Sequence, residues 1–262
     1  MSSVSFVIPS LNQRRYLKRC LDSCFAQGLN DFEVIVRDGK STDGSVELLK
    51  EYDKPVTWTS EKDGGQAAAI NAGIAAAQKD IIAWINSDDY YATSNTLKQV
   101  VALFDADPEL DIVYGNGKLV DDQGKVITSF PSRPLEDMKT ILLHPVSFVL
   151  QPTVFFRREL YLRVGGLNEE LHWALDYDLW LRLFPAARKV HYLPQVLACG
   201  TVHADAKSVY GMRPQFRETW NLKWQYAPQF QLNTFDYGRL YWGHAKNQLY
   251  YLAVKTGLKK VT

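Results

Sequence analysis

The segment DIIAWINSDD, residues 80–89, passes from a run of apolar side chains directly into two adjacent carboxylates, Asp88 and Asp89. A short apolar run bounded by polar residues is typical of a strand that is buried on both faces. Two ionised carboxylates this close repel each other unless a cation or a set of hydrogen-bond donors holds them. Helix capping is the structural alternative, but Thr93 and Ser94 lie nearer to the next helix. The segment therefore predicts a buried strand with a metal or phosphosugar site at its carboxyl end.

Strands and helices alternate on both sides of this segment. The apolar patterns predict strands at 4–9, 32–36, 56–59, 80–85 and 111–115, and helices at 14–27, 43–52, 66–78 and 94–107. Asp43 is the expected cap of the second helix. Strands that alternate with helices of this length form βαβ units, so we expect an α/β fold with a mostly parallel sheet.

The pattern changes after residue 115. Residues 117–129 resemble a hairpin with DDQG as its turn, 147–160 a strand that enters a helix, and 176–184 a short amphipathic helix. The last part of the chain, 211–262, is rich in Trp and Tyr and has a basic end, so we expect a helical extension there.

These patterns divide the chain into a main domain and an extension. We expect one domain over 1–210, made of a first part over about 1–115 and a second part over about 116–210, followed by the extension.

Composition restricts the class of protein. The chain has 262 residues, 46% of them hydrophobic, and a formal net charge of +1, which gives no electrostatic reason to expect a nucleic-acid partner. Cys20 and Cys24 share an apolar helix face and are expected to pack in the core. The first residues do not resemble a signal peptide, and no apolar run reaches about 18 residues. We therefore expect a cytoplasmic protein.

Polar side chains follow each of the first four predicted strands. Asn12, Asp38 and Asp63 follow the first three, and the pair Asp88 and Asp89 follows the fourth. Ligands of open parallel sheets bind beyond the carboxyl ends of the strands, so these side chains are expected at one rim. Asp38 also fits a simple Asp-Gly turn. However, other residues are available to cap the following helix, which would leave Asp38 free for a ligand.

Five segments together resemble family 2 glycosyltransferases of the GT-A fold. In order, they are VSFVIPSLNQRRYLKRCLDS, VRDGKSTDGS, EKDGGQAAAINAGI, IIAWINSDD and DYDLWLRL. The resemblance covers about residues 3–205. It implies a nucleotide-sugar donor, a divalent metal (Mn²⁺ or Mg²⁺) and transfer with inversion at the anomeric carbon.

The resemblance also implies roles for individual residues. Those expected at the nucleotide and donor sugar are Pro9, Asn12, Asp38, Asp63, Gln66, Asn71 and Asp88. Asp89 matches the metal-contacting aspartate of the DXD-type element. His203 matches a histidine that completes the metal or diphosphate site in some relatives, whereas a loop histidine of no function is the alternative.

The general base is expected in ALDYDLWLRL. Asp176 matches the aspartate of relatives that read Glu-Asp here, although Leu175 replaces the glutamate. An N-cap role is the alternative for Asp176. Asp178 precedes Arg182 by four residues, so an ordinary helix ion pair accounts for it.

Two further departures concern the donor. Asn86 stands where many relatives have a second aspartate, and Arg37 precedes Asp38 where an aspartate is frequent. A UDP-sugar is the favoured donor, with GDP- or dTDP-sugars as alternatives. The expected acceptor is a glycan or a lipid-linked saccharide, in the synthesis of cell-surface polysaccharide.

Other functions remain open at this stage. A sugar nucleotidyltransferase would usually carry a glycine-rich phosphate loop, which PSLNQRRY is not, and a dehydrogenase would carry G-x-G-x-x-G. A non-catalytic nucleotide-sugar-binding protein would not need Asp176. The aromatic, basic extension could lie on the inner face of the membrane, pack on the domain or form a dimer contact.

Overall fold

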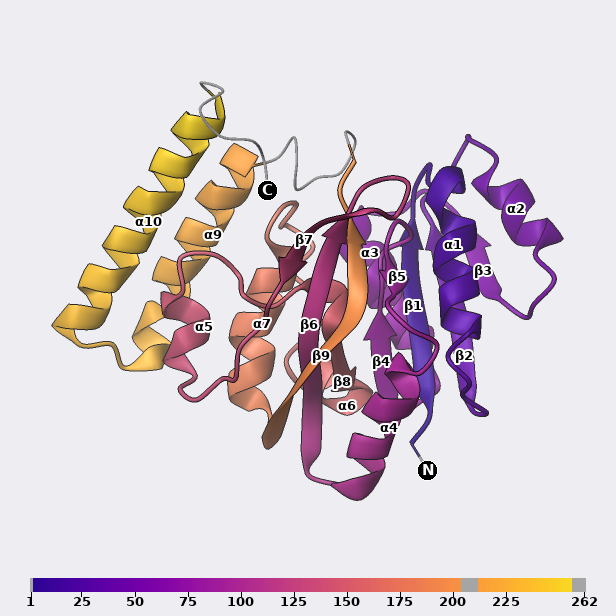
Figure 1. Cartoon of the computed structure of the whole chain (residues 1–262), viewed down its shortest axis with the longest axis horizontal. Coiled ribbons are helices and arrows are strands. Elements are labelled where there is room, and N and C mark those ends of the chain that lie inside the picture. Colours follow the sequence, from indigo (N-terminus) through magenta and orange to yellow (C-terminus); the bar gives the residue numbers. More distant parts are fainter. Residues whose placement is uncertain (1, 204–211, 256–262) are drawn as a thin grey trace.

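The computed structural model describes residues 2–203 and 212–255. It contains a nine-stranded sheet in the order β3-β2-β1-β4-β8-β6-β9-β5, with β7 paired to β6, and helices cover both faces (Figure 1). This confirms the predicted α/β class.

The first part of the chain alternates strands and helices as predicted. Its elements are β1 (Val4–Ser10), α1 (Arg14–Phe25), β2 (Phe32–Asp38), α2 (Ser45–Glu51), β3 (Thr57–Ser60), α3 (Gln66–Ala76) and β4 (Ile81–Trp84). All three strand pairs among them are parallel. The carboxyl ends of these four strands therefore meet at one edge of the sheet.

Helix α3 lies unusually close to β1. A Cβ atom added at Gly73 would lie 2.5 Å from Cγ1 of Val7, a distance that real Cβ atoms do not show. The alanine-rich sequence of this helix is thus explained by close packing, which sets the helix start near the carboxyl end of β1.

The second part of the chain makes the sheet mixed. Its elements are β5 (Tyr90–Tyr91), α4 (Thr96–Ala106), β6 (Leu110–Val120), β7 (Val126–Phe130), α5 (Lys139–Leu143), η1 (Gln151–Thr153), β8 (Val154–Arg157), α6 (Arg158–Arg163), α7 (Leu175–Ala186) and β9 (Lys189–Thr201). β8 runs antiparallel to both β4 and β6, so the sheet is mixed rather than mostly parallel. β9, which the sequence patterns did not predict, pairs parallel to β6 and antiparallel to β5.

The predicted DDQG turn is confirmed. Oδ1 of Asp121 accepts hydrogen bonds from the backbone N–H groups of Gln123 (3.1 Å) and Lys125 (2.8 Å). Gly124 has a φ of +83°, which glycine adopts without strain. The turn joins β6 to β7 as an antiparallel hairpin.

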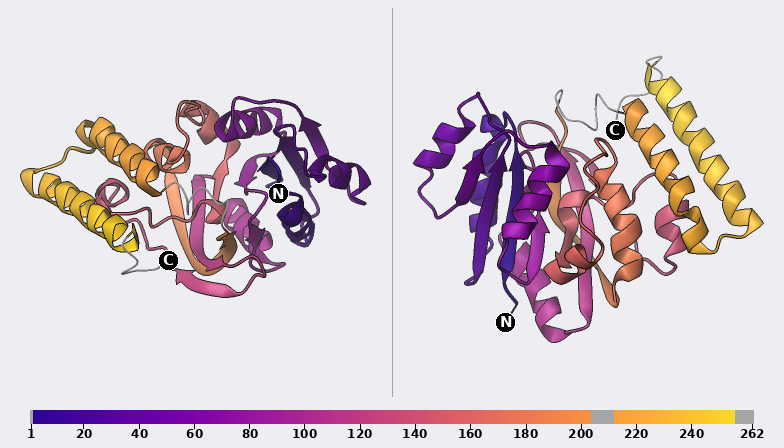
Figure 2. Two further views of the ribbon diagram at one scale, coloured as in Figure 1. Left: turned by 90° about the horizontal axis from the view of Figure 1, so that it is seen from above. Right: turned by 180° about the vertical axis from the view of Figure 1, so that it is seen from behind.

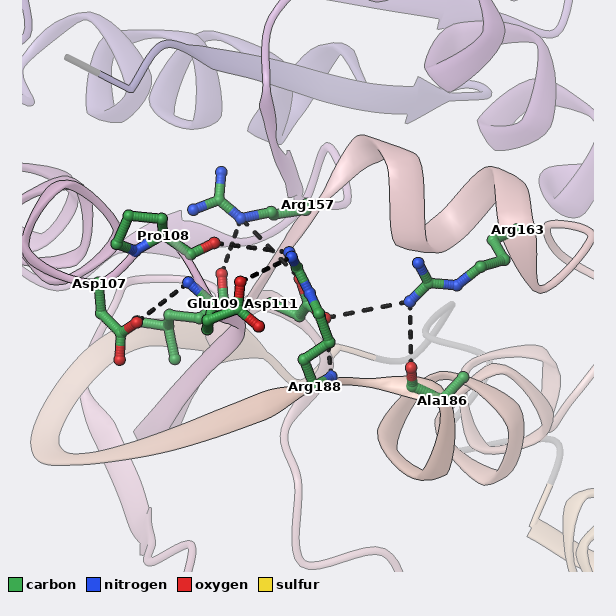
Figure 3. Close-up of polar contacts among 9 residues, drawn as sticks. Asp107, Pro108, Glu109, Asp111, Arg157, Arg163, Ala186 and Arg188 are labelled. Carbon is green, nitrogen blue, oxygen red and sulfur yellow. Dashed lines mark hydrogen bonds and ion pairs between the residues drawn. The ribbon is translucent and has the colours of Figure 1, made fainter.

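Three strands are tied together at the edge of the sheet away from the carboxyl ends of β1–β4. Asp111, at the start of β6, is 2% exposed, and its carboxylate accepts hydrogen bonds from the Arg188 side chain and backbone N–H (Figure 3). Arg157 of β8 and Arg163 of α6 lie 3.9 and 4.0 Å from the same carboxylate. Burial acts to raise the pKa of Asp111, but the hydrogen bonds from Arg188, together with the charges of Arg188 and Arg163, outweigh it and lower the pKa.

The C-terminal extension, called the tail below, forms a helical pair at the end of the molecule opposite α2 and β3 (Figures 1 and 2). It comprises α9 (Met212–Tyr226), η2 (Ala227–Phe230) and α10 (Thr234–Lys255). Aromatic rings join the two helices: Trp220 stacks on His244 with centroids 4.0 Å apart, and Trp224 stacks on Tyr237 at 5.8 Å. Within residues 2–203 and 212–255, no helix combines the length and apolar character needed to cross a membrane.

Candidate active site

A large cleft of about 1600 Å³ lies beyond the carboxyl ends of β1 and β4. Its other walls come from 145–152, from 172–177 and from both tail helices. Eight of the ten residues predicted for the site line it: Pro9, Asn12, Asp63, Gln66, Asp88, Asp89, Asp176 and His203. Convergence at one rim was predicted for Asn12, Asp38, Asp63, Asp88 and Asp89, and all of these except Asp38 line the cleft.

Asp89 is held by the end of β9. Its carboxylate, 7% exposed, accepts a hydrogen bond of 2.9 Å from the backbone N–H of Thr201. Burial, and after it the neighbouring Asp88 carboxylate, raise the pKa of Asp89 well above its usual range. Arg19 lies beside the pair and donates to the Asp88 carbonyl (3.2 Å) and to Oγ1 of Thr201 (2.9 Å).

His203 contacts Asp88 directly. Its Nε2 atom lies 3.0 Å from Oδ2 of Asp88, and its ring lies against Tyr16 with centroids 4.8 Å apart. The histidine side chain is 3% exposed, whereas that of Asp88 is 21% exposed. His203 is therefore a built part of the acidic site, and the alternative of an exposed loop histidine is wrong.

A row of side-chain amides connects α3, the loop after β4 and η1. Nε2 of Gln66 donates to Oδ1 of Asn86 (3.0 Å), and Nδ2 of Asn86 donates to Oε1 of Gln151 (3.1 Å). Gln151 in turn donates to the carbonyl of Trp84 (2.8 Å). Asn86, which stands where many relatives have an aspartate, thus fixes the loop after β4 through Gln66 and Gln151. The sequence signal for Gln151 was a lone amide in the apolar run SFVLQPTVFF.

Asn12 and Asp63 shape the part of the cleft near β1 and the start of α3 through backbone contacts. Asn12 has a φ of +54°, and its Oδ1 accepts a hydrogen bond from the N–H of Thr42 (2.9 Å). Oδ1 of Asp63 accepts from the N–H of Gly65 at the start of α3 (2.9 Å). Both side chains keep loops at the strand ends in fixed positions.

Asp38 is not free for a ligand, contrary to the expectation above. It is 2% exposed, and its carboxylate accepts hydrogen bonds from the N–H (2.9 Å) and hydroxyl of Ser41 and from the hydroxyl of Ser60 (2.6 Å). Asp43, the expected cap of α2, contacts the N–H of Ser45 (3.0 Å), while Gly44 occupies the cap position. Asp38 therefore organises the loop after β2 and does not line the cleft.

Asn71 also lies outside the cleft lining. Its amide nitrogen donates to the Leu167 carbonyl (3.0 Å) and to Glu169 (2.8 Å), and its oxygen accepts from the Leu167 N–H (2.9 Å) and the Tyr161 hydroxyl. These contacts tie α3 to the loop that leads toward α7. Its predicted contact with the donor remains a prediction.

Asp176 faces the cleft from the first turn of α7. The helix begins at Leu175 with Ala174 at the cap position, so Asp176 is not the N-cap. One carboxylate oxygen accepts from the N–H of Tyr177 (2.8 Å), and burial raises the pKa of Asp176 to about 6. This is the range in which a general base works well near neutral pH.

Asp178 is structural, as the spacing predicted. It is 2% exposed and forms the expected ion pair with Arg182. The hydroxyl of Tyr226, in the tail, donates to its other oxygen at 2.9 Å.

The donor set near the acidic pair fits a divalent cation only in part. Among residues 2–203 and 212–255, no three His, Cys, Asp or Glu side chains are grouped so that they could hold a metal by themselves. Mg²⁺ commonly takes one or two carboxylates and completes its shell with substrate phosphates and water. Asp88, Asp89 and His203 offer ligands of this incomplete kind.

The chain has the GT-A fold, a mixed α/β sheet in which an acidic pair after β4 and a carboxylate in the first turn of α7 line one cleft. Solved structures support this fold. S. aureus TarS in complex with UDP-GlcNAc matches with a TM-score of 0.70 at 21% identity, over 90% of this chain and 69% of that one. The mannosyltransferase PcManGT from Pyrobaculum calidifontis, in complex with GDP-Man and Mn²⁺, matches with a TM-score of 0.67 at 18% identity, over 97% and 75% of the two chains.

Sequence comparison gives the family. Residues 5–165 match the model of glycosyl transferase family 2, and the chain belongs to this family. An uncharacterized glycosyltransferase of Rickettsia conorii is 30% identical over 78% of this chain and 35% of its own length. A chondroitin synthase of Pasteurella multocida is 28% identical over 81% of this chain and 22% of its own. The chain thus spans about a third and about a fifth, respectively, of these relatives.

Proposed function

We propose that the protein is an inverting glycosyltransferase that moves a sugar from a nucleoside-diphosphate sugar to an acceptor hydroxyl. One observation carries the proposal: Asp88 and Asp89 line the same cleft as Asp176, whose pKa is raised to about 6. A nucleotide-binding protein without activity has no need of a buried carboxylate with this pKa.

The chain's own residues provide the proton chemistry. Asp176, in its ionised form, accepts the proton of the acceptor hydroxyl as the oxygen attacks the anomeric carbon. The new carbon–oxygen bond forms as the bond to the diphosphate breaks, and the electron pair of that bond leaves with the diphosphate. Attack from the opposite side inverts the anomeric centre and needs no covalent intermediate.

The acidic pair would provide part of the ligand shell of a divalent cation. Asp89, assisted by Asp88 and His203, would hold it, and such an ion neutralises the charge that develops on the departing diphosphate. The chain's contribution is to fix these ligands through Thr201 and Arg19.

The relatives support a choice of donor and of pathway. TarS was solved with UDP-GlcNAc, and the chondroitin and hyaluronan synthases are polysaccharide synthases by name. We therefore favour a UDP-sugar donor, GDP- or dTDP-sugars being the alternatives, and a role in cell-surface polysaccharide or glycan synthesis. Residues 145–152 and 172–173, which line the cleft beyond Asp176, are the proposed acceptor side.

Nucleotide binding is the first test. Titration calorimetry with UDP, GDP and dTDP, in Mn²⁺ and in EDTA, should show metal-dependent binding of one nucleotide. In Asp89→Asn this binding should weaken at least about tenfold, since the variant loses a charged ligand. Asp53→Asn, which removes an exposed carboxylate outside the cleft lining, should bind as the wild type does.

Turnover is the second test. Release of nucleoside diphosphate from UDP-GlcNAc and GDP-Man, with NMR of the anomeric proton of the product, measures both the activity and its stereochemistry. Binding without any turnover of these and other nucleotide sugars would favour the non-catalytic alternative. Retention at the anomeric carbon would contradict the role given to Asp176.

A further inference from the structure

We propose that Glu218, on tail helix α9, is a positioning residue that holds Asp176 in place. The inference rests on the proposed function, because it concerns the carboxylate to which we assign the general-base role. It makes the tail a working part of the active site.

Glu218 caps the start of α7 from another helix. Its Oε2 accepts hydrogen bonds from the backbone N–H groups of Trp173 (2.8 Å) and Ala174 (2.9 Å), and its Oε1 lies 3.4 Å from that of His172. These three residues lead directly into the helix turn that carries Asp176. Only Leu175 therefore separates Asp176 from Ala174, whose backbone N–H is fixed by Glu218.

The start of α7 lacks a cap of its own. Ala174 at the cap position has no hydrogen-bonding side chain, and no side-chain cap bond is present there. The first N–H groups of a helix have no partner within the helix and carry partial positive charge. A carboxylate from α9 satisfies this need with charge-assisted hydrogen bonds, which are stronger than those of a neutral cap.

The face of α9 that carries Glu218 also contacts the core and α7 at points of its own. Leu222 is buried in the core, and the Tyr226 hydroxyl donates to the buried Asp178 carboxylate of α7. These positions follow Glu218 at intervals of four residues, so they lie on the same face of α9. Lys223, 5% exposed, donates to the His144 carbonyl and so ties the same helix to the loop on the far side of the cleft.

Different segments of the chain therefore support nucleotide binding and the general base. The family match ends at residue 165, whereas α7 and α9 both lie beyond it. The nucleotide end of the cleft depends on β1, β4 and the end of β9, and the general base depends on the tail. A change at Glu218 should therefore affect catalysis and leave nucleotide binding intact.

The experiment compares Glu218→Ala, Glu218→Gln and Tyr226→Phe with the wild-type protein. Tyr226→Phe is the matched control, because it removes another hydrogen bond between α9 and α7 without touching the residues before Asp176. Hydrogen exchange of 172–178 reports the positioning, calorimetry with UDP or GDP in Mn²⁺ reports nucleotide binding, and nucleoside-diphosphate release from UDP-GlcNAc or GDP-Man reports kcat and KM.

In Glu218→Ala, we expect faster exchange at 172–178 and a fall in kcat of about 10- to 100-fold, with the nucleotide Kd and the donor KM within about twofold of wild type. Glu218→Gln keeps an acceptor oxygen and should recover most of the kcat. Tyr226→Phe should lower the Tm and leave kcat unchanged.

An unchanged exchange rate or an unchanged kcat in Glu218→Ala would overturn the inference. An equal loss of kcat in Tyr226→Phe would also overturn it, since the effect would then be general loosening of α7. Absence of turnover in the wild-type protein would overturn the proposed function and this inference together, whereas turnover in wild type and Glu218→Ala alike would overturn the inference alone.

Discussion

Nε2 of His203 lies 3.0 Å from Oδ2 of Asp88, which joins the end of β9 to the loop after β4 across 115 residues of sequence. The Thr201 N–H holds Asp89 from the same strand end. The acidic pair is therefore completed by a strand that the sequence patterns did not predict.

His203→Phe tests this relationship. Phenylalanine keeps a ring against Tyr16 but loses the contact with Asp88, and a hydrogen bond to a charged group contributes about 1.5–3 kcal/mol. We expect calorimetry to show UDP or GDP binding in Mn²⁺ weakened about tenfold or more. His191→Phe, at the other end of β9, is the control and should bind normally. Equal nucleotide affinities of the two variants would show that His203 does not contribute to nucleotide binding.

Asp176→Asn should abolish most of the turnover. Loss of a general base typically costs about 10²–10⁴-fold in rate. The nucleotide Kd should stay within about twofold, because Asp176 lies on α7 whereas the acidic pair to which we assign the diphosphate follows β4. Stopped assays of nucleoside-diphosphate release measure the loss. A variant with wild-type kcat would require a different base.

The pH dependence of kcat should follow the same residue. Because the pKa of Asp176 is raised to about 6 and only the ionised form accepts a proton, kcat should rise as pH increases through about 6. If kcat instead rises through about pH 4, the usual pKa range of an aspartate, Asp176 is not the base.

Asp176→Asn should also stabilise the protein at alkaline pH. The folded-state pKa lies above the unfolded value of about 3.9, so ionisation of Asp176 lowers the stability of the wild type progressively between about pH 4 and 6. Urea unfolding should therefore give the variant a larger free energy of unfolding at pH 8, and the difference should shrink toward pH 4. A less stable variant at pH 8 would contradict the cause given for the raised pKa.

Asp111→Asn should destabilise the protein without affecting nucleotide binding. Loss of this buried carboxylate removes the charged acceptor that Arg188 and Arg157 share, and hydrogen bonds to charged groups contribute about 1.5–3 kcal/mol. Asp107→Asn is the control, since its pair with Lys189 is exposed to solvent and the substitution should change the stability much less. Urea unfolding at pH 7 separates the two expectations.

The sequence by itself determined the first part of the fold and much of the site. Apolar runs located β1 through β4 and helical periodicity located the helices between them, because strands such as β1 and β4 are buried along their whole length and the helices pack on the sheet. Parallel strands place their carboxyl ends at one edge, so the sequence could predict that Asn12, Asp63 and Asp88 face one cleft. The ion pair of Asp178 with Arg182 also followed from spacing alone.

Only the tertiary structure decided which polar groups are left for a ligand. Asp38 and Asn71 carry the same functional groups as Asp88 and Gln66, yet their hydrogen bonds go to Ser41, Ser60 and the loop before α7. Sequence patterns register periodicity along the chain, and the partner of a buried polar group is set by segments that meet only after folding.

The same reason explains β9 and the tail. β9 is only partly buried over its first residues and shows no alternation, so its place in the sheet depends on its pairing with β6. Glu218 is an ordinary helix residue in the sequence, and its contact with Trp173 and Ala174 exists because α9 packs across the head of α7. The sequence therefore determined which functional groups the chain provides, and the tertiary structure decided which partners hold each charged side chain.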